Sequence, residues 1–110
     1  MDEVSQSVAP EIQADIGELI SNLQTLGWRV THSHYYAKVC GDWYIDFEGS
    51  ASPIRLVKDR SQYMVMEVPI EILKAAGLWR AFDDLAEFQA TVIKWAEALS
   101  GSGDSASEHK

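Results

Sequence analysis

The sequence predicts an α+β fold, a two-layer sandwich in which a four-stranded antiparallel meander is packed on one face by N- and C-terminal helices. Two observations lead to this prediction. Near both ends of the chain, apolar residues recur every three or four positions, which is the spacing of one helical face. Between these segments, residues 28–68 contain runs of aromatic and β-branched residues separated by short polar turns, as is typical of consecutive strands.

The first helix is expected to begin at Pro10, because proline suits the first helical turn. It is expected to end before Gly27, since glycine readily adopts the left-handed conformation that terminates helices. Its apolar stripe comprises Ile12, Ile16, Leu19, Ile20, Leu23 and Leu26.

The strands differ in how clearly they alternate. In the second strand, Trp43, Ile45 and Phe47 share one face and leave the polar residues to the other. The first strand, within 28–39, has no purely apolar side, so we place it at or near a sheet edge. The remaining strands are expected at 54–58 and 62–68, after connections at 49–53 and 59–61.

Two further helices are expected after the strands. Pro69 and Gly77 delimit a short helix, and Asp84 with Glu87 resembles a capping box near the start of a long one. The stripe of the long helix is Phe82, Leu85, Phe88, Val92, Trp95 and Leu99. Residues 1–99 are therefore expected to form a single domain. Residues 100–110 contain no apolar residue larger than alanine and are expected to be a disordered tail.

Both long helices are expected to cover the same face of the sheet and to leave the other face open. The expected core is Ile12, Ile16, Leu19, Leu23, Trp43, Ile45, Phe47, Ile54, Leu56, Met64, Met66, Phe82, Leu85, Phe88, Val92 and Trp95.

Charge and composition limit the class of partner. The formal net charge of −8 repels nucleic-acid phosphates and attracts basic proteins. No apolar run reaches the roughly 20 residues that span a bilayer, and Asp2 and Glu3 stand where a secretory signal carries positive charge. Cys40 is the only cysteine, which excludes an internal disulfide and fits a reducing compartment. We expect a cytoplasmic protein that binds neither nucleic acid nor membrane.

The sequence offers little for metal binding or catalysis. His32 and His34 share a strand face, but neither Cys40 nor His109 stands at a spacing that completes a zinc site, so we assign no metal or other cofactor. Asp42, Asp46, Glu48 and Glu67 would be paired carboxylates only in a pocket that desolvates one of them. Without a nucleophile or phosphate-binding motif beside them, we expect no enzymatic activity.

The open sheet face is the expected binding surface. Tyrosines supply contact area at low entropic cost, and carboxylates steer a basic partner. The expected partner-binding residues are Tyr44, Asp46, Glu48, Arg55, Tyr63 and Glu67, with Val57 and Val65 exposed among them. The alternative is that these are ordinary solvated positions of a strand, since tyrosine is a good strand former.

Two segments carry a resemblance to a known class of proteins. They are Gly41-Asp42-Trp43-Tyr44-Ile45-Asp46-Phe47-Glu48 and the strand from Ile54 to Tyr63 with its Lys-Asp-Arg turn. This pattern resembles the small acidic immunity proteins that bacteria encode beside polymorphic or contact-dependent toxins. The resemblance implies a cytosolic, non-catalytic protein that binds and neutralises a cognate toxin, and it carries over no functional residue.

Two other functional classes remain open. Secretion-type chaperones are also small, acidic α+β proteins, although those that this chain resembles place a helix among their strands. A small enzyme that uses the sheet carboxylates is the third class. A homodimer formed through the first strand is also left open.

Overall fold

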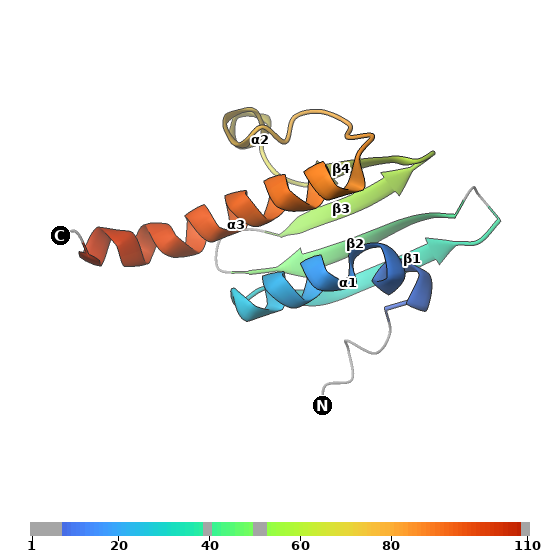
Figure 1. The fold of residues 1–110 in the computed structure, drawn as a ribbon, viewed down its shortest axis with the longest axis horizontal. Helices are drawn as coiled ribbons and strands as arrows, with labels where there is room; N and C mark the ends of the chain where they lie inside the picture. The colour runs from blue at the N-terminus through green and yellow to red at the C-terminus, as the bar shows by residue number, and fades with distance from the viewer. Residues whose placement is uncertain (1–7, 39–40, 50–52, 109–110) are drawn as a thin grey trace.

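The computed structural model describes residues 8–38, 41–49 and 53–108, with side chains through Leu99. The elements follow the order helix, four strands, helix, helix (Figure 1). They are α1 (Pro10–Thr25), β1 (Arg29–Tyr36), β2 (Asp42–Glu48), β3 (Ile54–Asp59), β4 (Gln62–Met66), α2 (Ile70–Ala76) and α3 (Leu85–Glu108).

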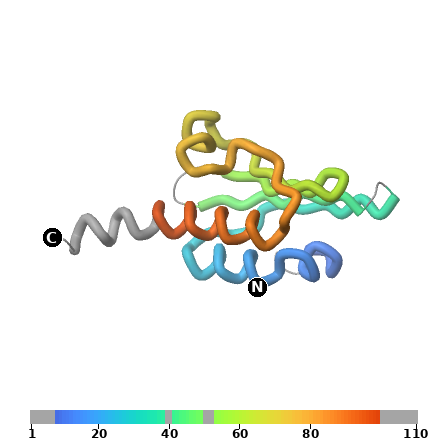
Figure 2. The backbone as a smooth tube through the Cα atoms, turned by 45° about the horizontal axis from the view of Figure 1, so that its top comes forward, coloured from blue at the N-terminus to red at the C-terminus, as the bar shows by residue number. Residues whose placement is uncertain are grey.

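The sheet is a simple antiparallel meander with strand order β1-β2-β3-β4. The prediction that the first strand lies at an edge is therefore confirmed. Helices α1 and α3 lie side by side over the same face, so the molecule has one helical layer and one sheet layer (Figures 1 and 2). The predicted two-layer α+β sandwich is confirmed. We call the helix-covered side of the sheet the inner face and the opposite side the outer face.

Local signals set the ends of α1 and α2. Pro10 opens α1, and Gly27 follows it at φ +98°, which a residue with a side chain rarely adopts. Helix α1 bends at Ile16, whose φ of −131° is non-helical. Pro69 precedes α2 and Gly77 closes it at φ +76°, as predicted.

The core lies between the helices and the inner face of the sheet. Most of the predicted core is buried, including the apolar stripe of α1, the alternate residues of β2 and the inner residues of α3. Leu85 and Trp95 are only partly buried. Buried residues that the sequence did not single out for the core are Val8, Ile20, Trp28, Val30, Val65, Val68, Leu73, Leu78 and Ala96.

The faces of β4 are opposite to those predicted. Val65 pairs with Leu56 and is buried on the inner face, whereas Met64 pairs with Val57 on the outer face. Met66, also expected in the core, is 46% exposed. The error comes from the length of the turn between β3 and β4. Because successive side chains on a strand point to opposite faces, a difference of one residue in the turn exchanges the two faces of the whole strand.

That turn has two residues, not three. Asp59 pairs with Gln62, so only Arg60 and Ser61 form the loop, and both have positive φ, +54° and +69°. Two-residue hairpin loops of type I′ require positive φ at both positions, and glycine or asparagine normally occupies them. The Arg-Ser pair lacks that sequence signal.

The first strand contains a register shift between Val30 and His32. Val30 pairs with Phe47 and is buried, while His32 pairs with Asp46 on the outer face. Val30 and His32 therefore lie on opposite faces although they are two residues apart, because Thr31 acts as a bulge that breaks the alternation.

The start of α3 differs from the prediction. Phe82 precedes the helix and forms a bridge with Tyr63, in which its N–H donates to the Tyr63 carbonyl at 2.7 Å and its carbonyl accepts from the Tyr63 N–H at 2.8 Å. The Asp84 carboxylate accepts a hydrogen bond from the N–H of Ala86 at 3.0 Å. Glu87 instead binds Arg80, also at 3.0 Å. Only the aspartate half of the expected capping box is formed.

Some expectations concern residues beyond those described. Cys40, His109 and residues 50–52 of the β2–β3 connection lie outside the described residues. The backbone of α3 continues to Glu108, whereas we expected the helix to end at Leu99. Helical hydrogen bonds need no apolar anchor, and no side chain beyond Leu99 is described, so the disordered tail stays a prediction.

Candidate protein-binding surface

The outer face carries side chains from all four strands, and most of them are polar or aromatic. Strand alternation and register place them there together. They are Arg29, His32, His34 and Tyr36 of β1, Asp42, Tyr44, Asp46 and Glu48 of β2, Arg55, Val57 and Asp59 of β3, and Gln62, Met64 and Met66 of β4.

Arg55 forms the centre of this face. Its Nε donates to Asp46 Oδ1 at 2.7 Å and its Nη2 donates to Asp46 Oδ2 at 3.0 Å, a two-pronged pair. Its guanidinium also lies 4.2 Å from the ring centroid of Tyr44. The hydrogen bond to Asp46 raises the pKa of Arg55, and the charges of Asp46, Tyr44 and Glu67 add to this against partial desolvation. Arg55 thus holds Asp46 and Tyr44 in fixed positions.

The other expected carboxylates of β2 are also engaged within the chain. Glu48 accepts from Arg29 Nη2 at 2.7 Å. Asp42 accepts from the backbone N–H of Arg60 at 2.9 Å and has no ion pair among the described side chains. Because Asp46 and Glu48 are matched by arginines, the outer face is less acidic than the sequence alone suggests.

Aromatic rings cluster at the β1 side of the face. The ring centroid of His34 lies 4.3 Å from that of Tyr36 in an edge-on contact and 6.4 Å from that of Tyr44. Tyr36 is 41% exposed. This cluster presents flat apolar area to solvent, the kind of surface that protein partners use as an anchor.

Two hollows lie on this side of the molecule and share one residue. The first, of about 370 Å³, is lined by outer-face residues including Tyr36, Tyr44 and Val57. The second, of about 430 Å³, lies at the β4 edge and is lined by Met64 and Trp79 among others. Met66 belongs to both. We call the set Tyr36, Tyr44, Val57, Met64, Met66 and Trp79 the aromatic-methionine strip.

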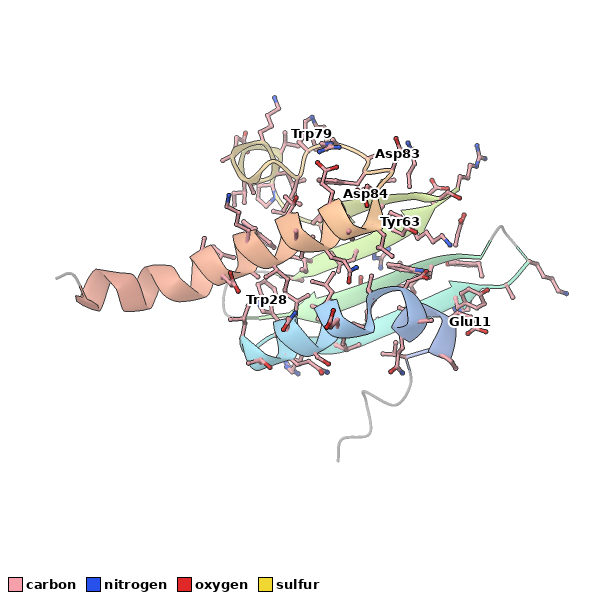
Figure 3. The ribbon with its side chains drawn as sticks, in the orientation of Figure 1. Glu11, Trp28, Tyr63, Trp79, Asp83 and Asp84 are labelled. Atoms are coloured by element: carbon pink, nitrogen blue, oxygen red, sulfur yellow. The ribbon has the colours of Figure 1, made fainter. Side chains whose placement is uncertain are left out.

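Tyr63 is not part of this surface, contrary to the prediction. It pairs with Lys58 and faces the helices, with its ring centroid 6.3 Å from that of Trp43 and 5.7 Å from that of Phe88. Figure 3 shows Tyr63 on the side of the sheet that α3 covers. Burial raises the pKa of Tyr63, and the negative charge of Asp15 raises it further.

Glu67 lies near the outer face, but not through the strand alternation on which the prediction rested. It follows the end of β4 and has φ +69°, so the alternation of the strand no longer decides its direction. Its negative charge adds to the raised pKa of Arg55, so Glu67 lies within electrostatic range of that guanidinium. Of the six expected partner-binding residues, the structure therefore brings together Tyr44, Asp46, Glu48, Arg55 and Glu67 and separates Tyr63 from them.

The sequence missed Met64, Met66 and Trp79 as surface residues. Trp79 is 53% exposed and lies in the connector after α2, beyond the β4 edge (Figure 3). Correct pairing of Asp59 with Gln62 would have placed both methionines on the outer face. No comparable sequence signal marks Trp79, because its position depends on how the connector packs.

The candidates for metal binding and catalysis, His32, His34 and the three carboxylates of β2, share the outer face. Among the described side chains, no three His, Cys, Asp or Glu residues come together to hold a metal ion. His32 and His34 share the outer face, as expected. Asp42, Asp46 and Glu48 each have the separate partner given above. The absence of a cofactor and of enzymatic activity stays a prediction.

Comparisons with known proteins identify no relative. No family model matches the chain, and neither the curated proteins nor the solved structures include a significantly similar one. Within the described part of the chain, no helix is both long enough and apolar enough to cross a membrane.

Proposed function

We propose that this chain is a non-enzymatic protein-binding module, and that it binds its partner through the outer face of the sheet. One observation carries the proposal, namely the aromatic-methionine strip that joins the two hollows through Met66. Three of its residues, Tyr36, Met66 and Trp79, are between 41% and 53% exposed. A contiguous apolar surface of this kind marks an interaction site on a soluble domain.

The charges around the strip support a protein partner. Arg55–Asp46 and Arg29–Glu48 are satisfied within the chain, so a partner can cover them without leaving an unpaired charge. Tyrosine, tryptophan, methionine and arginine are also the residues that interfaces favour. The centre of the face therefore supplies contact area, and the net charge of −8 adds long-range attraction for a basic partner.

Within this class, the first candidate is a bacterial immunity protein that neutralises a cognate toxin in the cytoplasm. Its support is the acidic net charge, together with the resemblance of the second and third strands to such proteins. The partner would be the toxin domain, held through Arg55 and the strip.

A second candidate is a secretion-type chaperone for an effector protein. The exposed Met66 and the neighbouring Met64 favour it, because methionine adapts to different apolar segments. The uninterrupted run of strands β1 to β4 counts against it, since the chaperones that the sequence resembles place a helix among their strands.

Co-expression with the product of the neighbouring reading frame tests the proposal. An immunity protein rescues growth from a toxic neighbour, whereas a chaperone keeps an effector soluble without relieving toxicity. Met66→Glu should abolish either effect, because it places a charge in the middle of the strip. Ile70→Glu is the matched control, since Ile70 on α2 is 47% exposed and Met66 is 46% exposed.

Three outcomes contradict parts of the proposal. Rescue that survives both substitutions shows that the outer face is the wrong surface. Loss with Ile70→Glu alone moves the interface to α2. If the wild-type chain neither rescues growth nor binds the neighbour's product, the immunity and chaperone functions should both be abandoned.

A further inference from the structure

A second apolar surface lies between α2 and α3, and it shares no residue with the aromatic-methionine strip. A hollow of about 610 Å³ opens there. Its apolar lining includes Ile72 and Ala76 of α2 and Trp95 and Ala98 of α3. The alanine side chains are too small to fill this space, and the larger Ile72 and Trp95 lie at its sides.

This groove has projections next to it as well as a hollow. Ile72 is 42% exposed although it lines the groove, and Leu99, one helical turn after Trp95, is 39% exposed. An exposed isoleucine beside an alanine-lined hollow can enter the same hollow on a second copy. The patch thus contains both a knob and a hole of matching apolar character.

Charge complementarity points to the same occupant. Glu71 lines the groove from α2 and Lys94 lines it from α3. Among the described side chains, neither forms an ion pair. A two-fold axis through the groove brings each Glu71 towards Lys94 of the other copy, so both opposite-charge contacts form at once.

We propose that the α2–α3 groove is the interface of a symmetric homodimer. Ile72 of each copy enters the groove of the other, and Glu71 of each copy faces Lys94 of the other. A patch that is complementary to itself in shape and in charge fits a second copy of this chain better than an unrelated partner. This dimer is independent of the proposed function, because the outer face of the sheet stays free in it.

Analytical ultracentrifugation over a concentration series tests the dimer. The wild-type chain should move from one to two copies per particle as concentration rises. Ile72→Asp should remain monomeric, because it places a charge in the apolar groove. Glu71→Lys and Lys94→Glu should each weaken association by about tenfold or more, since each creates two like-charge contacts.

The two charge variants allow a sharper test than loss of binding. When Glu71→Lys and Lys94→Glu are mixed, both contacts in the mixed dimer pair opposite charges, so association should return. The doubly substituted chain should also dimerise. Glu97→Lys, on α3 but outside the groove lining, is the control and should leave association unchanged.

Two results overturn the proposal. One is a wild-type chain that stays monomeric up to concentrations on the order of 1 mM. The other is a mixture of the charge variants that associates no better than either variant alone while circular dichroism shows both folded. Neither result bears on the proposed function. If that function is correct, Ile72→Asp should still bind the outer-face partner as a monomer.

Discussion

The two apolar surfaces of this molecule differ in how their charges are arranged. Among the exposed large hydrophobic residues, Tyr36, Met66 and Trp79 belong to the strip, whereas Ile70, Ile72 and Leu99 lie on α2 and α3, where Ile72 lines the groove. On the outer face, Arg55 is paired with Asp46 and Arg29 with Glu48. Beside the α2–α3 groove, one acid and one base stand apart. A surface whose charges are paired within the chain suits a partner unlike the chain itself. A surface with separated opposite charges suits a second copy of the chain.

The largest expected effect comes from the core that supports both surfaces. Phe88 is fully buried and contacts the rings of Tyr63 and Phe82. Phe88→Ala should lower the free energy of unfolding by about 3–5 kcal/mol, because it removes a large buried ring and leaves a cavity. Urea denaturation measures this. Met66→Ala should change it by no more than about 0.5 kcal/mol, and an equal loss in both variants would show that Met66 is core after all.

Gly49 offers a way to disturb one surface and spare the other. A Cβ atom at this position would lie 2.5 Å from the Trp28 ring, whose centroid is 6.0 Å from that of Trp95 in the groove. Gly49→Ala should therefore cost about 1–3 kcal/mol of stability through overpacking.

The shift should reach the groove through Trp95 and weaken self-association, measured by ultracentrifugation below the melting temperature. Binding at the outer face should change much less. Equal weakening at both surfaces would show that they are coupled through the core.

The Arg55–Asp46 pair tests the role of internally paired charges. Asp46→Asn should lower stability by no more than about 1 kcal/mol, because both side chains are partly exposed and solvent screens the pair. It should also free Arg55 and slow the association of a basic partner, as followed by stopped-flow fluorescence at several salt concentrations. Faster association would mean that the partner is acidic. Self-association at the groove should not respond.

The smallest effect expected is a pH dependence of the unfolding free energy that arises from Tyr63. Burial raises the pKa of Tyr63 above its ordinary value of about 10. A raised pKa means that the folded state favours the protonated phenol, so this stabilisation is present below pH 10 and is lost as the pH rises through the folded pKa. Tyr63→Phe should reduce the fall in unfolding free energy above pH 10, as measured by denaturation at pH 9 and above. An unchanged fall would assign the alkaline loss to other groups.

The helices and the overall architecture could be predicted because their signals are local. The apolar stripe of α1 and the positions of Pro10, Gly27 and Gly77 depend on neighbours a few residues away. The expected set of strands also followed from composition and turns.

Which side chains face the core and which face solvent could be predicted only in part. This depends on the exact number of residues in each turn or bulge and on how distant elements pack. The two-residue turn at Arg60 and Ser61 shifts the alternation of β4 by one residue, which moves Tyr63 inward and Met66 outward. The bulge at Thr31 separately shifts the alternation of β1. The outer-face residues of β2 needed no such correction. The α2–α3 groove brings together residues about twenty positions apart in the chain, and no sequence period links them.

The Phe82 bridge determines how far copies of this sheet can add to one another. It occupies the free edge of β4 at Tyr63, while β1 forms the other edge. Two copies that pair through β1 would use both of their accessible edges at once, and each end of the joined sheet would then be a β4 strand blocked by its own Phe82. Edge-to-edge growth would then be hindered at both ends. The contact made by one residue of a connector therefore opposes extension of the sheet at β4.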